Sequence, residues 1–266
     1  MNLPPLRFTG TLLTTLAICG GCAIVASCAA PTTPSATLPA TLPTAQQVID
    51  RYIEVTGGRA AYESIKSRRQ VGTVDIPAQG VRGVTRSAVT RERGKLTSTL
   101  DSIGTVIQGF DHDLAYAVDP STGARLLSGD EKNATIQQLT INAEIDLAGF
   151  LEARVTGIDT YRDKPCYRLA LTTAAGQEIV RLYEVESGLL VRASAPVPSL
   201  GKGVQMVVTY ADYQPAPPIQ RAMFTRMQVG TPGIVVVETR FTKVEHNVEM
   251  DDDELAPPDA VKQLNK

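Results

Sequence analysis

From Arg68 to about residue 244 the chain is a succession of short extended segments, each bounded by Gly, Asp, Asn or Pro. Such punctuated segments are typical of β-strands, and tight links such as 111–113, 161–163 and 186–188 are typical of hairpins. No regular alternation of helix and strand is visible, so the sequence predicts a mainly β (α+β) fold built on one strongly curved antiparallel sheet. The predicted strands are 68–76, 81–91, 94–101, 104–110, 113–119, 152–158, 164–172, 178–185, 188–194, 204–213, 221–229 and 233–244.

A helix precedes the first strand. Thr44 is followed by Gln47 at the spacing of a capping box, and Gly57-Gly58 supplies a stop signal, which predicts a helix between them. A short second helical turn is expected over 59–65.

One helical interruption separates two groups of strands. Between 128 and 151, Ser128 precedes Glu131 at capping-box spacing, and apolar residues recur along the segment. This pattern predicts a helix or a helix pair, and we expect the helices to cap the concave side of the sheet.

Residues 1–27 have the features of a secretory signal. Arg7 precedes an apolar run that is too short and too interrupted for a membrane span. The run ends in Val25-Ala26-Ser27-Cys28, which resembles the lipobox of bacterial lipoproteins, whose cysteine is lipidated and becomes the new N-terminus. We therefore expect Cys28 to anchor the protein to a membrane. A plain signal cleaved near this point is the alternative, and Cys22 is a second candidate for lipidation.

The residues after Cys28 have the composition of a linker. Residues 29–43 contain four prolines and no charged residue, which favours an extended polyproline II tether over 28–43. At ~3.1 Å per residue, such a tether could hold the domain up to ~45 Å from its anchor. The folded domain is predicted to span 44–258, followed by a C-terminal tail over 259–266.

Removal of the signal changes the cysteine and charge counts. Cys166 is left as the one internal cysteine, so no internal disulfide is expected, and it should pack as a small apolar residue. Only Arg7 is lost from the 26 basic residues, so 25 basic and 28 acidic residues remain and the net charge is −3. No basic block points to nucleic acid as a partner. We expect a monomer.

Several predicted strands carry apolar residues at every second position, so each presents one apolar face. These faces could form an ordinary core against the helices or line a ligand cavity within the curved sheet. Trp is absent and aromatic residues are few, so such a cavity would suit flexible acyl chains. The candidate lining residues are Leu114, Tyr116, Val118, Tyr167, Leu169, Leu171, Met206, Val208, Tyr210, Met223, Met227 and Val229.

Several segments resemble the LolA/LolB superfamily of lipoprotein carriers and related outer-membrane lipoprotein-sorting proteins, over about residues 44–258. The resemblance implies an unclosed β-barrel capped by helices, whose concave interior binds acyl chains. The Pro-rich stretch 215–221 departs from the family, which usually has a Gly and a Pro there. The lipidated cysteine is a feature of the outer-membrane acceptor and not of the soluble carrier. The similar segments are 48–54 with 57–59, 109–111 with 114–116, 182–192, 210–213, and 244–249 with 255–258.

No established catalytic signature is present, since the HExxH, Gly-x-Ser-x-Gly and Walker patterns do not occur. Ser199 and Lys202 match a Ser-x-x-Lys spacing, but the companion motifs of penicillin-binding enzymes are missing. His112 lies in an Asp-rich turn and His246 precedes the acidic run 251–254, so a metal site is conceivable at either, although ordinary turn and surface roles explain both. We expect no catalytic residue, no metal and no cofactor.

Together these features predict a lipid-anchored cell-envelope protein, facing the periplasm, that binds acyl chains of lipids or lipoproteins non-covalently. Its role would lie in lipoprotein sorting or lipid transfer. Ala29 follows Cys28 where an Asp would retain a lipoprotein at the inner membrane of enteric bacteria, which favours the outer membrane. Two alternatives remain open: an envelope sensor or protein-interaction module with the same fold, and an envelope hydrolase.

Overall fold

The computed structural model describes residues 41–197, 200–230 and 235–264. Within them the chain forms one sheet of 13 strands, in which every pair of neighbours is antiparallel. The strands are β1 (Ser67–Ile76), β2 (Val81–Thr90), β3 (Arg93–Leu100), β4 (Gly104–Asp111), β5 (Leu114–Asp119), β6 (Gly123–Leu126), β7 (Glu152–Tyr161), β8 (Lys164–Thr172), β9 (Glu178–Glu184), β10 (Leu190–Pro196), β11 (Gln205–Ala216), β12 (Ile219–Val229) and β13 (Val235–His246).

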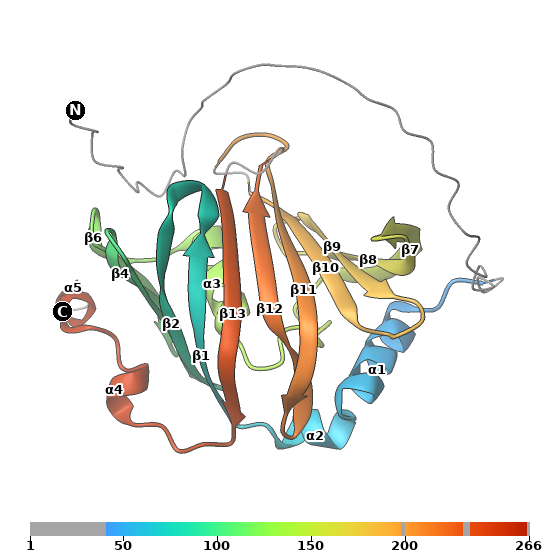
Figure 1. The fold of residues 1–266 in the computed structure, drawn as a ribbon, viewed down its shortest axis with the longest axis horizontal. Helices are drawn as coiled ribbons and strands as arrows, with labels where there is room; N and C mark the ends of the chain where they lie inside the picture. The colour runs from blue at the N-terminus through green and yellow to red at the C-terminus, as the bar shows by residue number, and fades with distance from the viewer. Residues whose placement is uncertain (1–40, 198–199, 231–234, 265–266) are drawn as a thin grey trace.

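The sheet consists of two meanders joined at one place. Strands β1 to β6 pair in chain order, as do β7 to β13, and the pairing of β1 with β13 connects the two groups. Strands β6 and β7 lie at opposite edges, so the sheet is strongly curved but not closed (Figure 1). The predicted mainly β class with an open, curved antiparallel sheet is confirmed.

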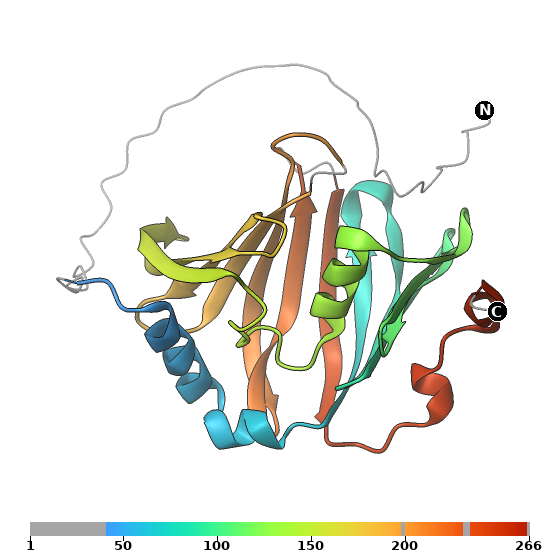
Figure 2. The ribbon, with the colours of Figure 1, turned by 180° about the vertical axis from the view of Figure 1, so that it is seen from behind.

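Short helices flank both faces of the sheet. The first three lie on the concave side, where Figure 2 shows α3 in front of the strands. The last two contact β2, β3 and β6 from the outer side, which is a difference from the expectation that all helices cap the concave face. The helices are α1 (Ala45–Thr56), α2 (Arg59–Ser64), α3 (Gly129–Leu139), α4 (Asp252–Leu255) and α5 (Asp259–Leu264), with a 3-10 turn η1 (Pro77–Gln79).

Helix α1 begins and ends at the predicted signals. The Thr44 hydroxyl accepts a hydrogen bond from the backbone N–H of Gln47 at 3.2 Å, and the Gln47 side-chain oxygen accepts one from the N–H of Thr44 at 2.8 Å. Gly57 ends the helix at a φ of 148°, and a Cβ there would come within 3.0 Å of Ile219. Glycine is therefore required both for this backbone and for the close approach to the β11–β12 turn.

The segment between the two meanders differs in part from the prediction. The helix stops at Leu139, and turns continue to residue 150. Its expected capping box is not formed, because Glu131 instead makes an ion pair with Arg125 at 2.5 Å, a fork-to-carboxylate contact. Strand β6 was not predicted; it is short and carries few apolar residues.

The chain is folded beyond residue 258. Val261 of α5 is fully buried, and α5 contacts β6, so the expected tail contains a packed helix. The predicted signal, Cys28 and residues 28–40 of the tether lie outside the described residues, as does Ser199.

Candidate lipid-binding face

Helix α1 covers one arm of the concave face. Its buried side, Val48, Ile49, Tyr52 and Ile53, packs against strands β8 to β12. Tyr52 meets Tyr183 edge-on, with ring centroids 5.7 Å apart. The strand residues buried under the helix are Leu169, Leu171, Tyr183, Leu190 and Ile219.

Helix α3 covers the other arm. Leu139 is buried against Val89, Phe110, Ala115 and Ala117, in a second apolar cluster that shares no buried residue with the first, although the partly buried Ile141 packs against both. The approach is close because Gly94 lies beneath the helix: a Cβ there would be 2.6 Å from the Phe110 ring and 3.0 Å from Leu139. Each arm of the sheet therefore has its own packed core.

Between the two arms, the strands β11, β12 and β13 present apolar side chains that belong to neither cluster. Met206 pairs with Val229, and Val208 with Met227, so these residues share the face of Tyr210, which packs under α1. Met206, Val208, Met227 and the adjacent Val237 are half-buried, whereas Met223, Val229 and Val235 on the same face are buried. We call this set the central strip; it consists of Met206, Val208, Met223, Met227, Val229, Val235 and Val237.

The structure divides the twelve predicted lining residues between the two faces. Nine lie on the concave face, where Tyr167, Leu169, Leu171 and Tyr210 belong to or pack against the α1 cluster and the other five belong to the central strip. The remaining three alternate with Ala115 and Ala117, which face α3, and therefore lie on the outer face. They are Leu114, Tyr116 and Val118.

A buried charge cluster lies at one end of the central strip. The Glu144 carboxylate accepts a hydrogen bond from Arg221 at 2.6 Å, and both side chains are less than one-fifth exposed. Burial raises the pKa of the Glu144 carboxyl, but the charges of Arg221 and Arg68 outweigh burial and hold it well below its usual range. Glu144 is therefore ionised at neutral pH.

Arg68 lies in the same cluster, opposite His246 in the β1–β13 pairing. Its side chain is buried, and its Nε has no hydrogen-bond partner among the described residues. Burial and the nearby Arg221 lower the pKa of Arg68 to about 9, against the opposing effect of Glu144, so the group is cationic at neutral pH. Burial also lowers the pKa of His246, which is therefore neutral at pH 7.

The loop that carries Glu144 is fixed to the sheet and to α2. Arg181 donates to the backbone oxygens of Glu144 at 2.9 Å and Ala143 at 3.2 Å. Asn142 donates to the backbone oxygen of Tyr62 at 3.0 Å. The loop therefore crosses the concave face, as Figure 2 shows, in a position fixed by these contacts and by the Glu144–Arg221 hydrogen bond.

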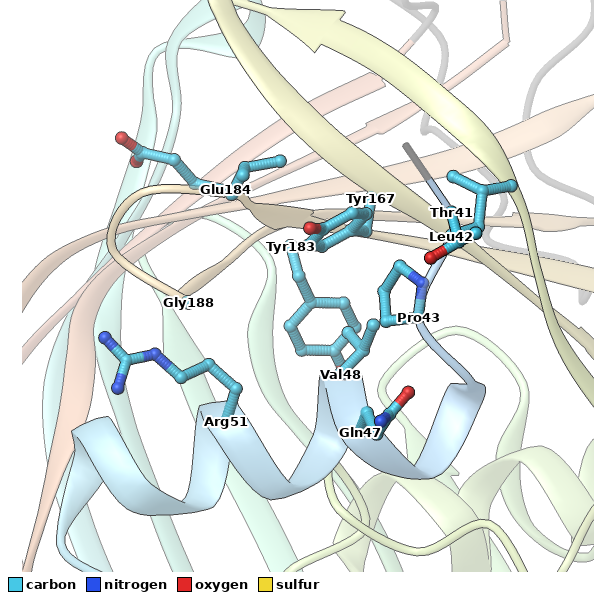
Figure 3. Close-up of a pocket in the computed structure, with 11 residues that line it drawn as sticks. Thr41, Leu42, Pro43, Gln47, Val48, Arg51, Tyr167, Tyr183, Glu184 and Gly188 are labelled. Atoms are coloured by element: carbon cyan, nitrogen blue, oxygen red, sulfur yellow. The ribbon is translucent and has the colours of Figure 1, made fainter. Parts of the chain in front are cut away.

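A pocket of about 410 Å³ opens beside the start of α1 (Figure 3). Leu42 and Pro43, at the end of the predicted tether, form one wall, and Tyr167 and Tyr183 form another. The chain thus enters the domain next to the α1 cluster.

The other residues considered from the sequence have ordinary surroundings. His112 contacts Asp111 at 2.7 Å in an exposed turn, and Nδ1 of His246 contacts the backbone oxygen of Pro217 at 3.1 Å. Cys166 is buried, and burial raises the pKa of its thiol. Within the described ranges no group of three or more His, Cys, Asp and Glu side chains could hold a metal ion. Over the same part of the chain, no helix is long and apolar enough to cross a membrane.

Sequence reasoning did not single out Arg68, Arg221 or Glu144. The available signal was the alternation of side chains along each strand, in which every second residue points to the same face. By this rule Arg221 shares the face of Met223, and Arg68 shares the face of Val74. A charged residue in phase with an apolar alternation indicates a buried charge. The position of Glu144 had no comparable signal, since it depends on the path of a loop.

Comparisons with known proteins identify the fold. No family model matches the sequence, and no curated protein matches it. Among solved structures, a LolA superfamily protein from Nitrosomonas europaea is similar with a TM-score of 0.55 at 13% identity, over 81% of this chain and 99% of that one. A putative outer membrane lipoprotein-sorting protein domain from Vibrio parahaemolyticus has a TM-score of 0.54 at 10% identity, over 83% and 98%.

A DUF1329 family protein from Desulfovibrio piger is similar to the same degree, with a TM-score of 0.54 at 11% identity, over 78% of this chain and 94% of that one. At such low identity the likeness concerns the fold alone. The chain therefore has the fold of LolA-like proteins, and nearly the whole length of each of these chains is matched.

Proposed function

We propose that this protein is a lipid-anchored component of the cell envelope that binds acyl chains of lipids or lipoproteins non-covalently on its concave face. The observation that carries the proposal is the central strip, an apolar surface whose side chains belong neither to the cluster under α1 nor to the cluster under α3. Contiguous, partly exposed apolar surface is typical of binding sites. Binding and release require no catalytic step, so we propose a carrier or acceptor and not an enzyme.

The expected driving force is burial of methylene groups. Each buried methylene contributes about 0.8 kcal/mol, so ten of them would supply about 8 kcal/mol before the costs of association. Methionine side chains adapt to flexible ligands, and Met206, Met223 and Met227 all lie in the strip.

The names of two similar structures support this role, since one is a LolA superfamily protein and the other a putative lipoprotein-sorting domain. In our proposal the envelope location and the periplasmic side follow from the lipobox-like segment ending in Cys28, and the outer membrane follows from Ala29 in place of an Asp after it. The role itself would be lipoprotein sorting or lipid transfer.

Lipid binding is tested on the protein bearing Cys28→Ser, so that no acyl group of its own is attached. Stoichiometric lipid detected by mass spectrometry, or saturable binding of a fluorescent fatty acid, is the expected result. A Val208→Asp change within the strip should abolish binding, because it places a carboxylate against the acyl chain. Thr209→Asp, on the other face of the same strand, should not.

An unaffected Val208→Asp variant would show that the strip is not the site. A protein that carries no lipid and has no affinity for fatty-acid probes would contradict the proposal altogether, and reproducible capture of one envelope protein by such a lipid-free domain would favour the sensor alternative.

The anchor is tested separately by metabolic labelling with a fatty-acid probe. Cys28→Ser should remove the label and Cys22→Ser should retain it. Labelling of the Cys28→Ser variant equal to that of the wild type would contradict lipidation at Cys28, without affecting the acyl-binding proposal.

A further inference from the structure

Arg68 is a buried cation without a hydrogen-bonded anion. Its side chain is 5% exposed, no ion pair or hydrogen bond of its guanidinium is found within the described residues, and its Nε is buried. Burying a charge without a partner is costly, and a buried guanidinium is normally paired. The neighbouring carboxylate of Glu144 does not fill this role, because it is hydrogen-bonded to Arg221.

The cluster therefore holds an excess of positive charge. Arg68 and Arg221 are cationic and Glu144 is anionic, which leaves one positive charge, since His246 is neutral at pH 7. A further anion at this place would supply the acceptor that Nε of Arg68 lacks.

The charge cluster and the apolar surface are two ends of the same face. Along β12, Arg221 is followed on its own side of the strand by Met223, Thr225, Met227 and Val229, so that side is apolar except for one threonine. Along β1, the same side carries the buried polar Gln70 and then Gly72 after Arg68, and only beyond them the buried apolar Val74 and Ile76. On β1 and β12, which lie on either side of β13, the concave face thus changes from charged at one end to apolar at the other.

We propose that the ligand is an amphiphile with an anionic head group, a carboxylate or a phosphate, which Arg68 binds while the acyl chain lies along the central strip. This deepens the proposed function, on which it rests, by naming the class of lipid. Along β12, from Arg221 in the charge cluster to Val229 in the central strip, eight residues of extended strand span ~26 Å at about 3.3 Å per residue. That span is comparable with the length of a long acyl chain.

The test compares ligands that differ only in the head. A fluorescent long-chain fatty acid and its methyl ester are titrated into the Cys28→Ser protein at pH 7, and lysophosphatidic acid and inorganic phosphate are used as competitors. The acid should bind at least ten-fold more tightly than the ester. Lysophosphatidic acid should displace the fatty acid, whereas inorganic phosphate should not, because phosphate has no acyl tail. Whichever of the fatty acid and lysophosphatidic acid binds more tightly identifies the preferred head group as a carboxylate or a phosphate.

Variants locate the head site. Arg68→Gln should reduce the preference for acid over ester to about one while leaving the affinity for the ester unchanged, and Arg68→Lys should keep part of the preference. The matched control is Arg86→Gln on β2, because Arg86 is exposed and lies on the outer face of the same sheet.

A second readout does not depend on binding. If Arg68 serves a ligand and not the fold, Arg68→Met should raise the melting temperature of the lipid-free protein, because it removes an unpaired buried charge. A lower melting temperature would show that Arg68 is structural and would overturn the inference.

The outcomes separate this inference from the proposed function. Equal affinity for acid and ester, or an unchanged preference in Arg68→Gln, overturns the anionic head group but leaves acyl binding intact. No binding of either probe overturns the proposed function itself. Displacement by phosphate as effective as by lysophosphatidic acid overturns the head-and-tail arrangement, since the tail would then contribute nothing.

Discussion

The ion pair of Glu144 and Arg221 is the residue-level feature with the most direct energetic consequence. Both side chains are largely buried, and Arg68 lies close enough to influence the titration of Glu144. Removing one member of such a pair leaves a buried charge without compensation, which costs more than the pair itself contributes. The same physical reason makes Arg68, which has no such partner, a position for a ligand.

Glu144→Gln should lower the free energy of unfolding at pH 7 by about 3 kcal/mol, because the buried guanidinium of Arg221 would then have no carboxylate partner. The folded-state pKa of Glu144 is depressed, so its contribution is complete above the unfolded value of about 4.3 and is lost as the pH falls toward the folded value. Chemical denaturation of both proteins between pH 7 and pH 2 measures this difference.

The difference between wild type and Glu144→Gln should therefore shrink below about pH 4.5. Glu63→Gln, in the exposed part of α2, is the control and should change neither the stability nor its pH dependence. A gap between wild type and Glu144→Gln that stayed constant down to pH 2 would show that Glu144 acts through packing and not through its charge.

At the scale of elements, the segment from α3 to β7 connects the two edges of the sheet across the concave face. Its helical part is held by apolar packing of Leu139, whereas the following turns combine polar contacts with packing of Ile145, Leu147 and Phe150 against the α1 cluster. Arg181 contributes two of these polar contacts, to the backbone oxygens of Ala143 and Glu144, and its guanidinium also lies over the Phe150 ring at 5.7 Å. Arg181 of β9 is thus one of several residues that hold the loop, together with Asn142 and the Glu144–Arg221 pair.

Arg181→Gln should loosen residues 140–150 without unfolding the sheet, because the contacts described for its guanidinium, two backbone oxygens and the Phe150 ring, all lie in this loop. Hydrogen exchange of backbone amides in this loop should accelerate by ten-fold or more, while amides of β8 and β9 keep their protection. Arg192→Gln on β10 is the control, since Arg192 lies on the outer face. Unchanged exchange in the loop would mean that other contacts hold it.

At the scale of the whole molecule, the pairing of β1 with β13 makes one sheet out of two meanders. All other pairings join strands that are consecutive in the chain, whereas this one joins its two ends. The pairing is close at Gly72, where an added Cβ would lie 2.6 Å from the backbone oxygen of Arg240.

Gly72→Ala should therefore lower the stability of the whole sheet, by about 1–3 kcal/mol, since β1 and β13 would have to separate locally. Faster exchange is expected in both meanders, measured at β3–β4 and at β8–β9. Gly149→Ala is the control, because the nearest atom to its added Cβ is 3.7 Å away. If only one meander responded, the two would be independent folding units.

Local patterns determined most of the secondary structure. The capping box of Thr44 and Gln47, the strand alternation and the hairpin turns depend on contacts between residues close in sequence, and twelve of the strands were predicted within a few residues of their positions. The failures were also local in origin. Strand β6 has too little apolar alternation to be recognised, and Glu131 has a competing partner in Arg125.

The tertiary structure alone decided which face of each strand is concave and what lies between the arms. Alternation correctly predicts that Leu114, Tyr116 and Val118 share one face of their strand, and that Met223, Met227 and Val229 share one face of theirs. It does not tell which of these faces is concave. Only the packing of α3 on Ala115 shows that the first group faces outward. The charge cluster likewise joins residues from β1, β12 and a loop. The periodicity of a sequence determines which residues of a strand point to the same side. Which of the two sides becomes the interior depends on contacts between segments that are distant in the sequence.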